Sequence, residues 1–264
     1  MKFTIGFIGC GNMGGALVKA VSKTIDGKQI ALCDALPEKA EALAKACGAT
    51  ALPAKELVEN TKIVVLGVKP QNAKQTLEPL KESLQKNQPL LVSMMAGTPI
   101  NAVREFAGVD LPVIRIMPNL PAMLGEGMIL YATDGVDLRG ENEFLRLFDK
   151  AGVLDKLPEE LIDCATALSG SGPAYVYAFT EALIEQTVAL GIPKEKAELY
   201  AYQTVIGAGK MMAEFGDPAS LRKAVCSPGG TTLAGLDAME KNGFSSAVKA
   251  GVENAYKRAL ELKK

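Results

Sequence analysis

The sequence predicts an α/β protein whose N-terminal part is a doubly wound parallel β-sheet and whose C-terminal part is helical throughout. Short apolar runs rich in β-branched residues alternate with helix-like stretches up to about residue 157, and strand patterns fade after it. Since parallel neighbours in a sheet need a crossover connection, this alternation indicates a parallel sheet. The 264 residues, of which 48% are hydrophobic, suffice for one large or two modest folded domains.

The first half of the chain opens with two strand and helix pairs. A strand over Lys2–Gly9 is followed by a helix over Asn12–Ser22, in which apolar residues recur at helical spacing. A second strand over Gln29–Asp34 precedes a helix over Pro37–Cys47, which starts with proline and ends before Gly48. The remaining expected elements are strands at Ile63–Val68, Leu90–Met94 and Val113–Met117, and helices at Asn72–Gln85 and Asn101–Phe106.

The second half is expected to be a separate helical domain, so we place one domain at residues 1–157 and the other at residues 158–264. Its clearest helices cover Ala174–Leu190, Lys194–Phe215, Pro218–Cys226 and Ser245–Leu262. The first two carry apolar residues on more than one face, which is more than a small helical layer can bury by itself. We therefore expect an interface between subunits here, with packing of these helices on the sheet domain as the alternative.

The composition excludes several classes of protein. Lys and Arg total 29 against 30 Asp and Glu, so no basic surplus for nucleic acid is present. No apolar run approaches the roughly 18 to 20 residues that cross a bilayer, so no membrane segment is expected. The N-terminus passes directly into a strand pattern, and the five cysteines lack paired spacing, which predicts a reducing cytoplasmic location without disulfides or zinc. The absence of histidine excludes Ser-His-Asp and Cys-His catalysis and histidine-bound metals.

The segment from Gly9 to Gly14 (GCGNMG) has the GxGxxG spacing, and it follows a predicted strand and opens a predicted helix. This context is typical of a Rossmann dinucleotide-binding fold, with Gly9 for the tight turn, Gly11 for the approach of a pyrophosphate and Gly14 for packing of the helix on the strand. A merely tight strand-to-helix turn is the alternative. The predicted cofactor-binding residues of this segment are Ile8, Gly9, Cys10, Gly11, Asn12, Met13 and Gly14.

Asp34 ends the second predicted strand, about twenty residues after Gly14, where a carboxylate can accept both hydroxyls of an adenosine ribose. The same carboxylate would repel a 2′-phosphate, so Asp34 favours NADH over NADPH. A solvated aspartate in a turn is the alternative.

Three further predicted strands end in residues that can line the same ligand, because open α/β sheets bind ligands at the carboxyl ends of their strands. The predicted cofactor contacts there are Val68, Lys69, Pro70, Ala96, Gly97 and Asn119. The alternatives are a solvated lysine for Lys69 and, for Asn119, a hydrogen bond to the backbone of its own turn.

The helical half contains two glycine-rich breaks, Ser169–Pro173 and Cys226–Thr232. In the second break, two glycines let successive amide groups point at one small anion, Pro228 stiffens the turn, and three hydroxyls lie close together. These features predict a cradle for a carboxylate. A plain turn between helices, with Thr231 or Thr232 as the N-cap, is the alternative.

Together these motifs resemble those of pyrroline-5-carboxylate reductases over nearly the whole chain, from about residue 3 to residue 262. The resemblance is carried by Ile5–Gly14 (IGFIGCGNMG), Val68–Pro70 (VKP), Met117–Asn119 (MPN), Ser169–Tyr175 (SGSGPAY) and Ser227–Thr232 (SPGGTT). It implies reduction of 1-pyrroline-5-carboxylate to L-proline with NAD(P)H, no metal, an N-terminal Rossmann domain and a C-terminal dimerisation domain. It also implies assembly as a homodimer or as a decamer of dimers.

The resemblance further implies a substrate site at the dimer interface. Ser227 and the amides of Gly230, Thr231 and Thr232 would hold the substrate carboxylate, and the hydroxyl of Thr232 would bind the ring nitrogen, which makes it the one residue assigned to catalysis. Glu159 matches a family position near the substrate. The missing histidine fits this chemistry, because an iminium ion can form in solution and needs no strong protein acid.

Two residues depart from the family pattern, and three alternative functions share parts of it. Leu120 stands where many relatives have threonine, and Asp34 stands where NADPH-preferring relatives carry a phosphate-tolerant residue. A β-hydroxyacid dehydrogenase or another imine reductase shares the glycine fingerprint, but the former needs a basic lysine on the long helix, and residues Ser171–Ile184 contain none. A dinucleotide-binding protein without turnover is the third alternative, and the intact SPGGTT turn argues against it.

Overall fold

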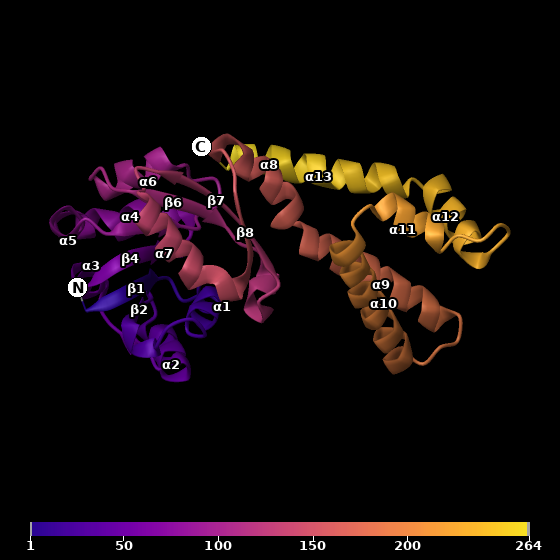
Figure 1. Ribbon diagram of the computed structural model, residues 1–264, viewed down its shortest axis with the longest axis horizontal. Helices are drawn as coiled ribbons and strands as arrows, with labels where there is room; N and C mark the ends of the chain where they lie inside the picture. Colours follow the sequence, from indigo (N-terminus) through magenta and orange to yellow (C-terminus); the bar gives the residue numbers. More distant parts are fainter. Residues whose placement is uncertain (1, 263–264) are drawn as a thin grey trace. The chain divides into compact units, whose positions relative to one another are not determined.

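The computed structural model describes residues 2–262 and divides the chain into two compact units (Figure 1). Unit 1 comprises the residues up to Ser171 together with those from Ala255 onward, and unit 2 comprises Gly172–Asn254. The helix that follows the predicted domain boundary at residues 157/158, α8 (Glu159–Ser169), is therefore grouped with the sheet in unit 1 rather than with the other helices.

Unit 1 is built on one eight-stranded sheet with the order β3-β2-β1-β4-β5-β6-β7-β8. Its strands are β1 (Phe3–Ile8), β2 (Ile30–Cys33), β3 (Thr50–Ala51), β4 (Thr61–Leu66), β5 (Leu90–Ser93), β6 (Val113–Met117), β7 (Gly127–Asp134) and β8 (Gly152–Lys156). The five strands predicted from the sequence are confirmed, whereas β3, β7 and β8 were not predicted. The sheet is parallel except between β6 and β7, which are antiparallel.

One pair of neighbours in the predicted parallel sheet, β6 and β7, is antiparallel, and the connection between these two strands explains it. Only the short 3₁₀ helix η4 (Leu120–Leu124) and its flanking residues join β6 to β7. This segment is too short for the crossover that a parallel neighbour requires, so β7 runs back beside β6.

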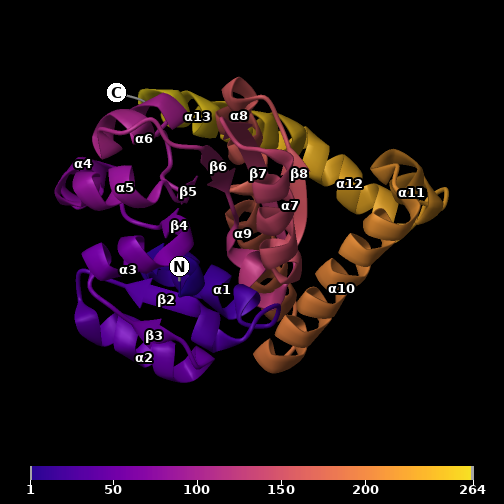
Figure 2. The ribbon, with the colours of Figure 1, turned by 60° about the vertical axis from the view of Figure 1, so that its left-hand side comes forward.

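Helices cover both faces of the sheet, as a doubly wound fold requires. One apolar cluster joins the sheet to α1 (Asn12–Val21), α2 (Pro37–Cys47) and α7 (Leu138–Phe148). The other joins it to α3 (Ala54–Asn60), α4 (Ala73–Leu77), α5 (Lys81–Asn87), α6 (Ile100–Ala107) and α8. Figure 2 shows α4, α5 and α6 on one side of β5 and β6 and α7 on the other.

The helix predicted over Asn72–Gln85 is divided in the structure into α4, a 3₁₀ turn at Glu78–Leu80 and α5. Pro79 lies within this interruption, since proline cannot donate the backbone hydrogen bond that a continuous helix needs.

Unit 2 is helical, as predicted. Its elements are α9 (Gly172–Ala189), α10 (Lys194–Phe215), α11 (Pro218–Ala224), α12 (Thr231–Lys241) and the first part of α13 (Phe244–Glu261), of which α12 was not predicted. Among residues 172–254, the structure buries only Thr180, Ala197 and Ala201. Nowhere in residues 2–262 is a helix both long enough and apolar enough to span a membrane.

Candidate functional site

The loops predicted to bind a cofactor lie side by side at the carboxyl edge of the sheet in unit 1. Backbone hydrogen bonds continue the strand pairing beyond the strand ends. The amide of Gly9 donates to the carbonyl of Cys33 at 2.8 Å, that of Gly67 to Ile8 at 2.8 Å, and that of Met94 to Leu66 at 3.2 Å. The sheet thus brings together residues 9–14, 34, 67–70 and 94–97, which form the expected ligand edge of an open α/β sheet.

Gly9 and Gly14 are required by the protein's own packing. Gly9 has a φ of +110°, and a Cβ atom there would lie 2.5 Å from the carbonyl oxygen of Gly67. A Cβ atom on Gly14 would collide with the carbonyl oxygen of Gly9, and one on Gly67 would collide with the side chain of Met94. These contacts hold α1 and β4 close to the turn after β1, which agrees with the roles predicted for Gly9 and Gly14.

Gly11 differs from its neighbours, because a Cβ atom added to it would meet no protein atom within 4 Å. Gly11 is also the N-cap of α1, which has no side-chain cap and no acidic residue in its first turn. Free amide groups at a helix N-terminus, with open space beside a glycine, form a ready site for an anion. The residues present therefore fit the pyrophosphate of a dinucleotide.

The carboxylate of Asp34 is held in place by the glycine-rich turn. One of its oxygens accepts a hydrogen bond from the amide of Cys10 at 2.6 Å, and the other accepts from the amide of Leu36 at 3.0 Å. Because a carboxylate oxygen has two lone pairs, each oxygen keeps one for a ribose hydroxyl. The geometry is thus compatible with the ribose contact predicted for Asp34.

Two cysteines flank this carboxylate. Burial, together with the nearby carboxylate of Asp34 and the thiol of Cys33, raises the pKa of the Cys10 thiol to about 12. Burial and Asp34 likewise raise the pKa of Cys33. Both thiols are protonated at neutral pH, so neither is a nucleophile.

The remaining predicted contacts of unit 1 differ in their surroundings. Val68 is half-buried, whereas Lys69 is exposed and Ala96 points to solvent beside buried Gly97. The side chain of Asn119 is 9% exposed and already has protein partners: its amide donates to the carbonyl of Ser169 at 3.0 Å, and its oxygen accepts from the amide of Met128 at 2.9 Å. Asn119 thus ties β6 to the end of α8, and its contact with the cofactor stays a prediction.

Glu159, predicted to lie near the substrate, belongs to a buried ionic cluster in unit 1. The guanidinium of Arg115, which is 1% exposed, lies 2.6 Å from a carboxylate oxygen of Asp163 and 3.4 Å from one of Glu159. The same Glu159 oxygen accepts a hydrogen bond from the amide of Ile100 at 2.7 Å, at the start of α6. The cluster joins β6, α6 and α8, and the contact of Glu159 with the substrate stays a prediction.

The hydroxyl-rich turn lies in unit 2, between α11 and α12. Helix α12 begins at Gly230 with no side-chain cap and no acidic residue in its first turn. The hydroxyl of Ser227 lies against Gly230, where a Cβ atom would collide with it, and Gly229 has a φ of +70°. Thr231 and Thr232 are the first residues of α12 and are exposed. The amide of Gly230 donates to the carbonyl of Ser227 at 3.0 Å, so the first-turn amides of α12 and the clustered hydroxyls are the groups that fit a small carboxylate.

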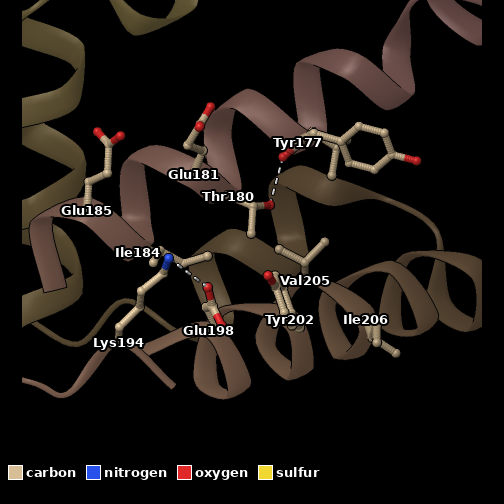
Figure 3. Close-up of a pocket in the computed structure, with 11 residues that line it drawn as sticks. Tyr177, Thr180, Glu181, Ile184, Glu185, Lys194, Glu198, Tyr202, Val205 and Ile206 are labelled. Atoms are coloured by element: carbon tan, nitrogen blue, oxygen red, sulfur yellow. Dashed lines mark hydrogen bonds and ion pairs between the residues drawn. The ribbon is translucent and has the colours of Figure 1, made fainter. Parts of the chain in front are cut away.

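A groove of about 720 Å³ runs between α9 and α10 in unit 2 (Figure 3). Its apolar lining includes Val176, Ile184, Val205 and Ile206, and Lys194 pairs with Glu198 at its edge. Ile206 is 51% exposed. Apolar side chains that remain open on two neighbouring helices mark a surface for another protein chain.

Sequence reasoning missed three residues that shape these sites. Arg115 had a signal, since it is a charge within the apolar strand VIRIM, but its partners lie in a distant helix. No sequence signal pointed to Met94, which lies between Gly14 and Gly67, or to Leu262, which lies against Gly97. Among the described residues, no group of three or more Cys, Asp or Glu side chains could hold a metal ion.

Comparisons with known proteins find matches to both the N-terminal and the C-terminal parts of the chain. Residues 159–262 match the family described as pyrroline-5-carboxylate reductase dimerisation, and residues 4–97 match that described as NADP oxidoreductase coenzyme F420-dependent. A pyrroline-5-carboxylate reductase from Pisum sativum is 37% identical, over 99% of this chain and 96% of its own. Two solved reductase structures are similar over 100% of this chain and 100% of their own. One is from Coxiella burnetii (TM-score 0.90, 31% identity), and the other is from Plasmodium falciparum with NADP bound (TM-score 0.89, 30% identity).

Proposed function

The chain belongs to the pyrroline-5-carboxylate reductase family, and from this premise we propose how its residues reduce 1-pyrroline-5-carboxylate to L-proline. We assign a nicotinamide dinucleotide to the glycine-rich edge of unit 1 and the substrate carboxylate to the hydroxyl-rich turn of unit 2. One observation carries the assignment. Each unit starts a helix at a glycine without a side-chain cap, α1 at Gly11 and α12 at Gly230, so each offers free amides to one anion.

In unit 1, the amides at the start of α1 hold the pyrophosphate, and the open space beside Gly11 admits it. Asp34 accepts the ribose hydroxyls with the lone pairs that Cys10 and Leu36 leave free. The segments Val68–Pro70 and Ala96–Gly97 line the same edge. This arrangement needs no histidine and no metal ion.

In unit 2, the amides of Thr231 and Thr232 and the hydroxyl of Ser227 hold the substrate carboxylate. The amide of Gly230, also predicted as a contact, donates instead to the carbonyl of Ser227 at 3.0 Å and closes the turn. The proposal is supported by the exposure of both threonines and by the absence of any acidic residue from the first turn of α12. A negative carboxylate is stabilised at this helix end by the macrodipole as well as by hydrogen bonds.

A reduced nicotinamide, when bound, supplies a hydride to the imine carbon of the substrate. The substrate nitrogen takes its proton from solution, so the products are the secondary amine of L-proline and the oxidised cofactor. The role of the protein is mainly orientation, which contributes up to about 7 to 11 kcal/mol in well-aligned reactions. Thr232 orients the ring by binding its nitrogen, and the protonated thiol of Cys10 takes no part.

The exposed apolar surface of α9 and α10 supports a homodimer as the smallest active assembly. We keep residues 158–264 as the dimerisation and substrate-binding domain, and we expect the substrate turn to work at the interface between two chains. Light scattering separates the homodimer from a decamer assembled from five dimers, since the decamer has five times the mass of the dimer.

The test of the proposed function is the loss of NADH or NADPH absorbance with pyrroline-5-carboxylate as substrate. We expect turnover with both cofactors and a higher kcat/KM with NADH, because Asp34 repels a 2′-phosphate. No turnover with either cofactor contradicts the proposed function. A higher kcat/KM with NADPH contradicts only the role of Asp34.

A further inference from the structure

The turn that follows β5 is enclosed on every side except one. Met95 and Thr98 are 1% and 5% exposed, Gly97 is buried, and only Ala96 faces solvent. The amide of Thr98 donates to the carbonyl of Met95 at 3.2 Å, which closes the turn before α6 begins. A ligand at the sheet edge can therefore touch this turn only at its Ala96 side.

The opposite side of the turn is covered by the C-terminal end of the chain. A Cβ atom on Gly97 would lie 2.8 Å from the carbonyl oxygen of Leu262 and 2.9 Å from its carbonyl carbon. Leu262 continues the last turn of α13, since its amide donates to the carbonyl of Arg258 at 3.2 Å. Figure 2 shows this end of α13 beside α6.

This contact lies within unit 1, because the residues from Ala255 onward are grouped with the sheet. It is a contact of backbone with backbone, so no side-chain rotation can open or close it. Gly97 is thus restricted twice, by its φ of +67° and by the carbonyl group of Leu262.

Gly48 provides a natural comparison. Its φ of +68° is nearly the same as that of Gly97, yet a Cβ atom there would meet nothing within 4 Å. An alanine imposes the same backbone strain at both positions, but it presses on the C-terminal end only at Gly97. The two glycines therefore separate the effect of strain from the effect of the contact.

We propose that the end of α13 is a positioning segment for the cofactor, in which Leu262 supports the turn Ala96–Thr98 from behind while the dinucleotide binds in front. The inference rests on the proposed function, because that function assigns Ala96 and Gly97 to the cofactor. Without this support the turn samples other conformations, and the apparent affinity falls in proportion to the fraction of chains in the binding conformation.

The test is a chain that ends at Glu261, compared with the full chain in the same assembly state. We expect its Kd for NADH, followed by the fluorescence of the bound cofactor, to rise by about tenfold if one chain in ten keeps the turn in place. The KM for NADH rises in parallel, whereas the KM for pyrroline-5-carboxylate and the circular dichroism spectrum stay unchanged. A Kd within about twofold of the full chain overturns the proposal.

Two alanine variants test the contact itself. Gly97→Ala is expected to weaken NADH binding, whereas Gly48→Ala is expected to lower Tm and leave NADH binding unchanged. Shortening the Gly97→Ala chain to Glu261 removes the obstacle, so the combined effect on Kd should be smaller than the product of the two separate effects. If the effects of Gly97→Ala and of the shortened chain on the Kd for NADH simply multiply, the proposed role of Leu262 is overturned.

Ala96→Asp distinguishes this inference from the proposed function. It places a carboxylate on the exposed side of the turn and leaves the Leu262 side untouched. If Ala96→Asp weakens NADH binding and the shortened chain does not, the cofactor assignment stands and the role of the C-terminus is overturned. If Ala96→Asp has no effect on NADH binding, the turn is no cofactor element, and both its assignment to the cofactor and the role of the C-terminus are overturned.

Discussion

Unit 1 and unit 2 bury their apolar residues in different ways. Unit 1 has an apolar cluster on each face of its sheet, with Phe7 and Phe144 in one cluster fully buried. In unit 2, Tyr177 and Ile206 are more than half exposed. Because a folded unit must bury its apolar faces, unit 1 has a core of its own whereas unit 2 needs another surface. The difference suggests that cofactor binding depends on the packing within one chain and substrate binding on assembly.

The largest expected effect concerns the buried ionic cluster of unit 1. Arg115→Met removes the guanidinium that pairs with the buried carboxylate of Asp163, and breaking a buried pair from one side costs about 3 to 5 kcal/mol. Denaturant unfolding measures the loss. The double variant Arg115→Met with Asp163→Leu should recover part of it, and a loss below about 1 kcal/mol for the single variant would show that the cluster does not stabilise unit 1.

The next effect concerns the assembly of unit 2. Ile206→Lys places a charge in the apolar groove of α10, and a central interface residue of this kind contributes about 2 kcal/mol or more to association. We expect dissociation to monomers and loss of activity, with unit 1 still binding NADH. Ala208→Lys, on roughly the opposite side of the helix, is the matched control. Equal mass distributions for the two variants would mean that the groove is not the interface.

A smaller effect is expected for cofactor choice within unit 1. Asp34→Ser removes the charge that repels a 2′-phosphate, so the ratio of kcat/KM for NADH to that for NADPH should fall by about tenfold. NADH binding should weaken as well, because the carboxylate also holds the amide of Cys10. Asp26→Ser, which removes a cap on the turn at Lys28, should leave the ratio unchanged. An unchanged ratio in Asp34→Ser would refute the predicted preference.

The smallest effect is a pH dependence at the edge of the sheet. Hydrogen bonds from Lys156, and then from Tyr131, lower the pKa of Glu141. A carboxyl whose pKa is lower in the folded state stabilises the fold above its ordinary pKa and loses that contribution as pH falls through the folded value. Since Lys156 is half-exposed, we expect at most about 1 kcal/mol. Lys156→Met should therefore flatten the acid limb of the stability curve, and an unchanged limb would contradict the assignment.

The fold could be predicted from the sequence wherever a local residue pattern determines the secondary structure. The five predicted strands and the helices α1, α2 and α6 follow from alternating periodicity, whereas α3 was not predicted. Gly9 and Gly14 have the spacing that their contacts require. Strand direction at β7 was not predictable in this way, because it depends on the length of one connection. Helix α12 was not predicted, because the glycines at its start indicate a turn and do not indicate a helix.

The candidate site was predictable only in its local parts. The turns at Gly9–Gly14 and Ser227–Thr232 can be predicted from their composition. The partners of Arg115 lie in α8, and the support of Gly97 lies at the far end of the chain, so both contacts exist only after folding. Such contacts cannot be predicted from spacing along the sequence, because the residues that make them are far apart in the chain.

The central claim is that the hydroxyl-rich turn of unit 2 orients the substrate for hydride transfer, and Thr232→Ala tests it most directly. The variant and the matched control Thr204→Ala are compared by NADH oxidation with saturating pyrroline-5-carboxylate and by the Kd for NADH. We predict that Thr232→Ala lowers kcat by about a hundredfold with an unchanged Kd for NADH, since misplacing a reactant by one ångström costs that much. A kcat for Thr232→Ala equal to that of Thr204→Ala would contradict the claim.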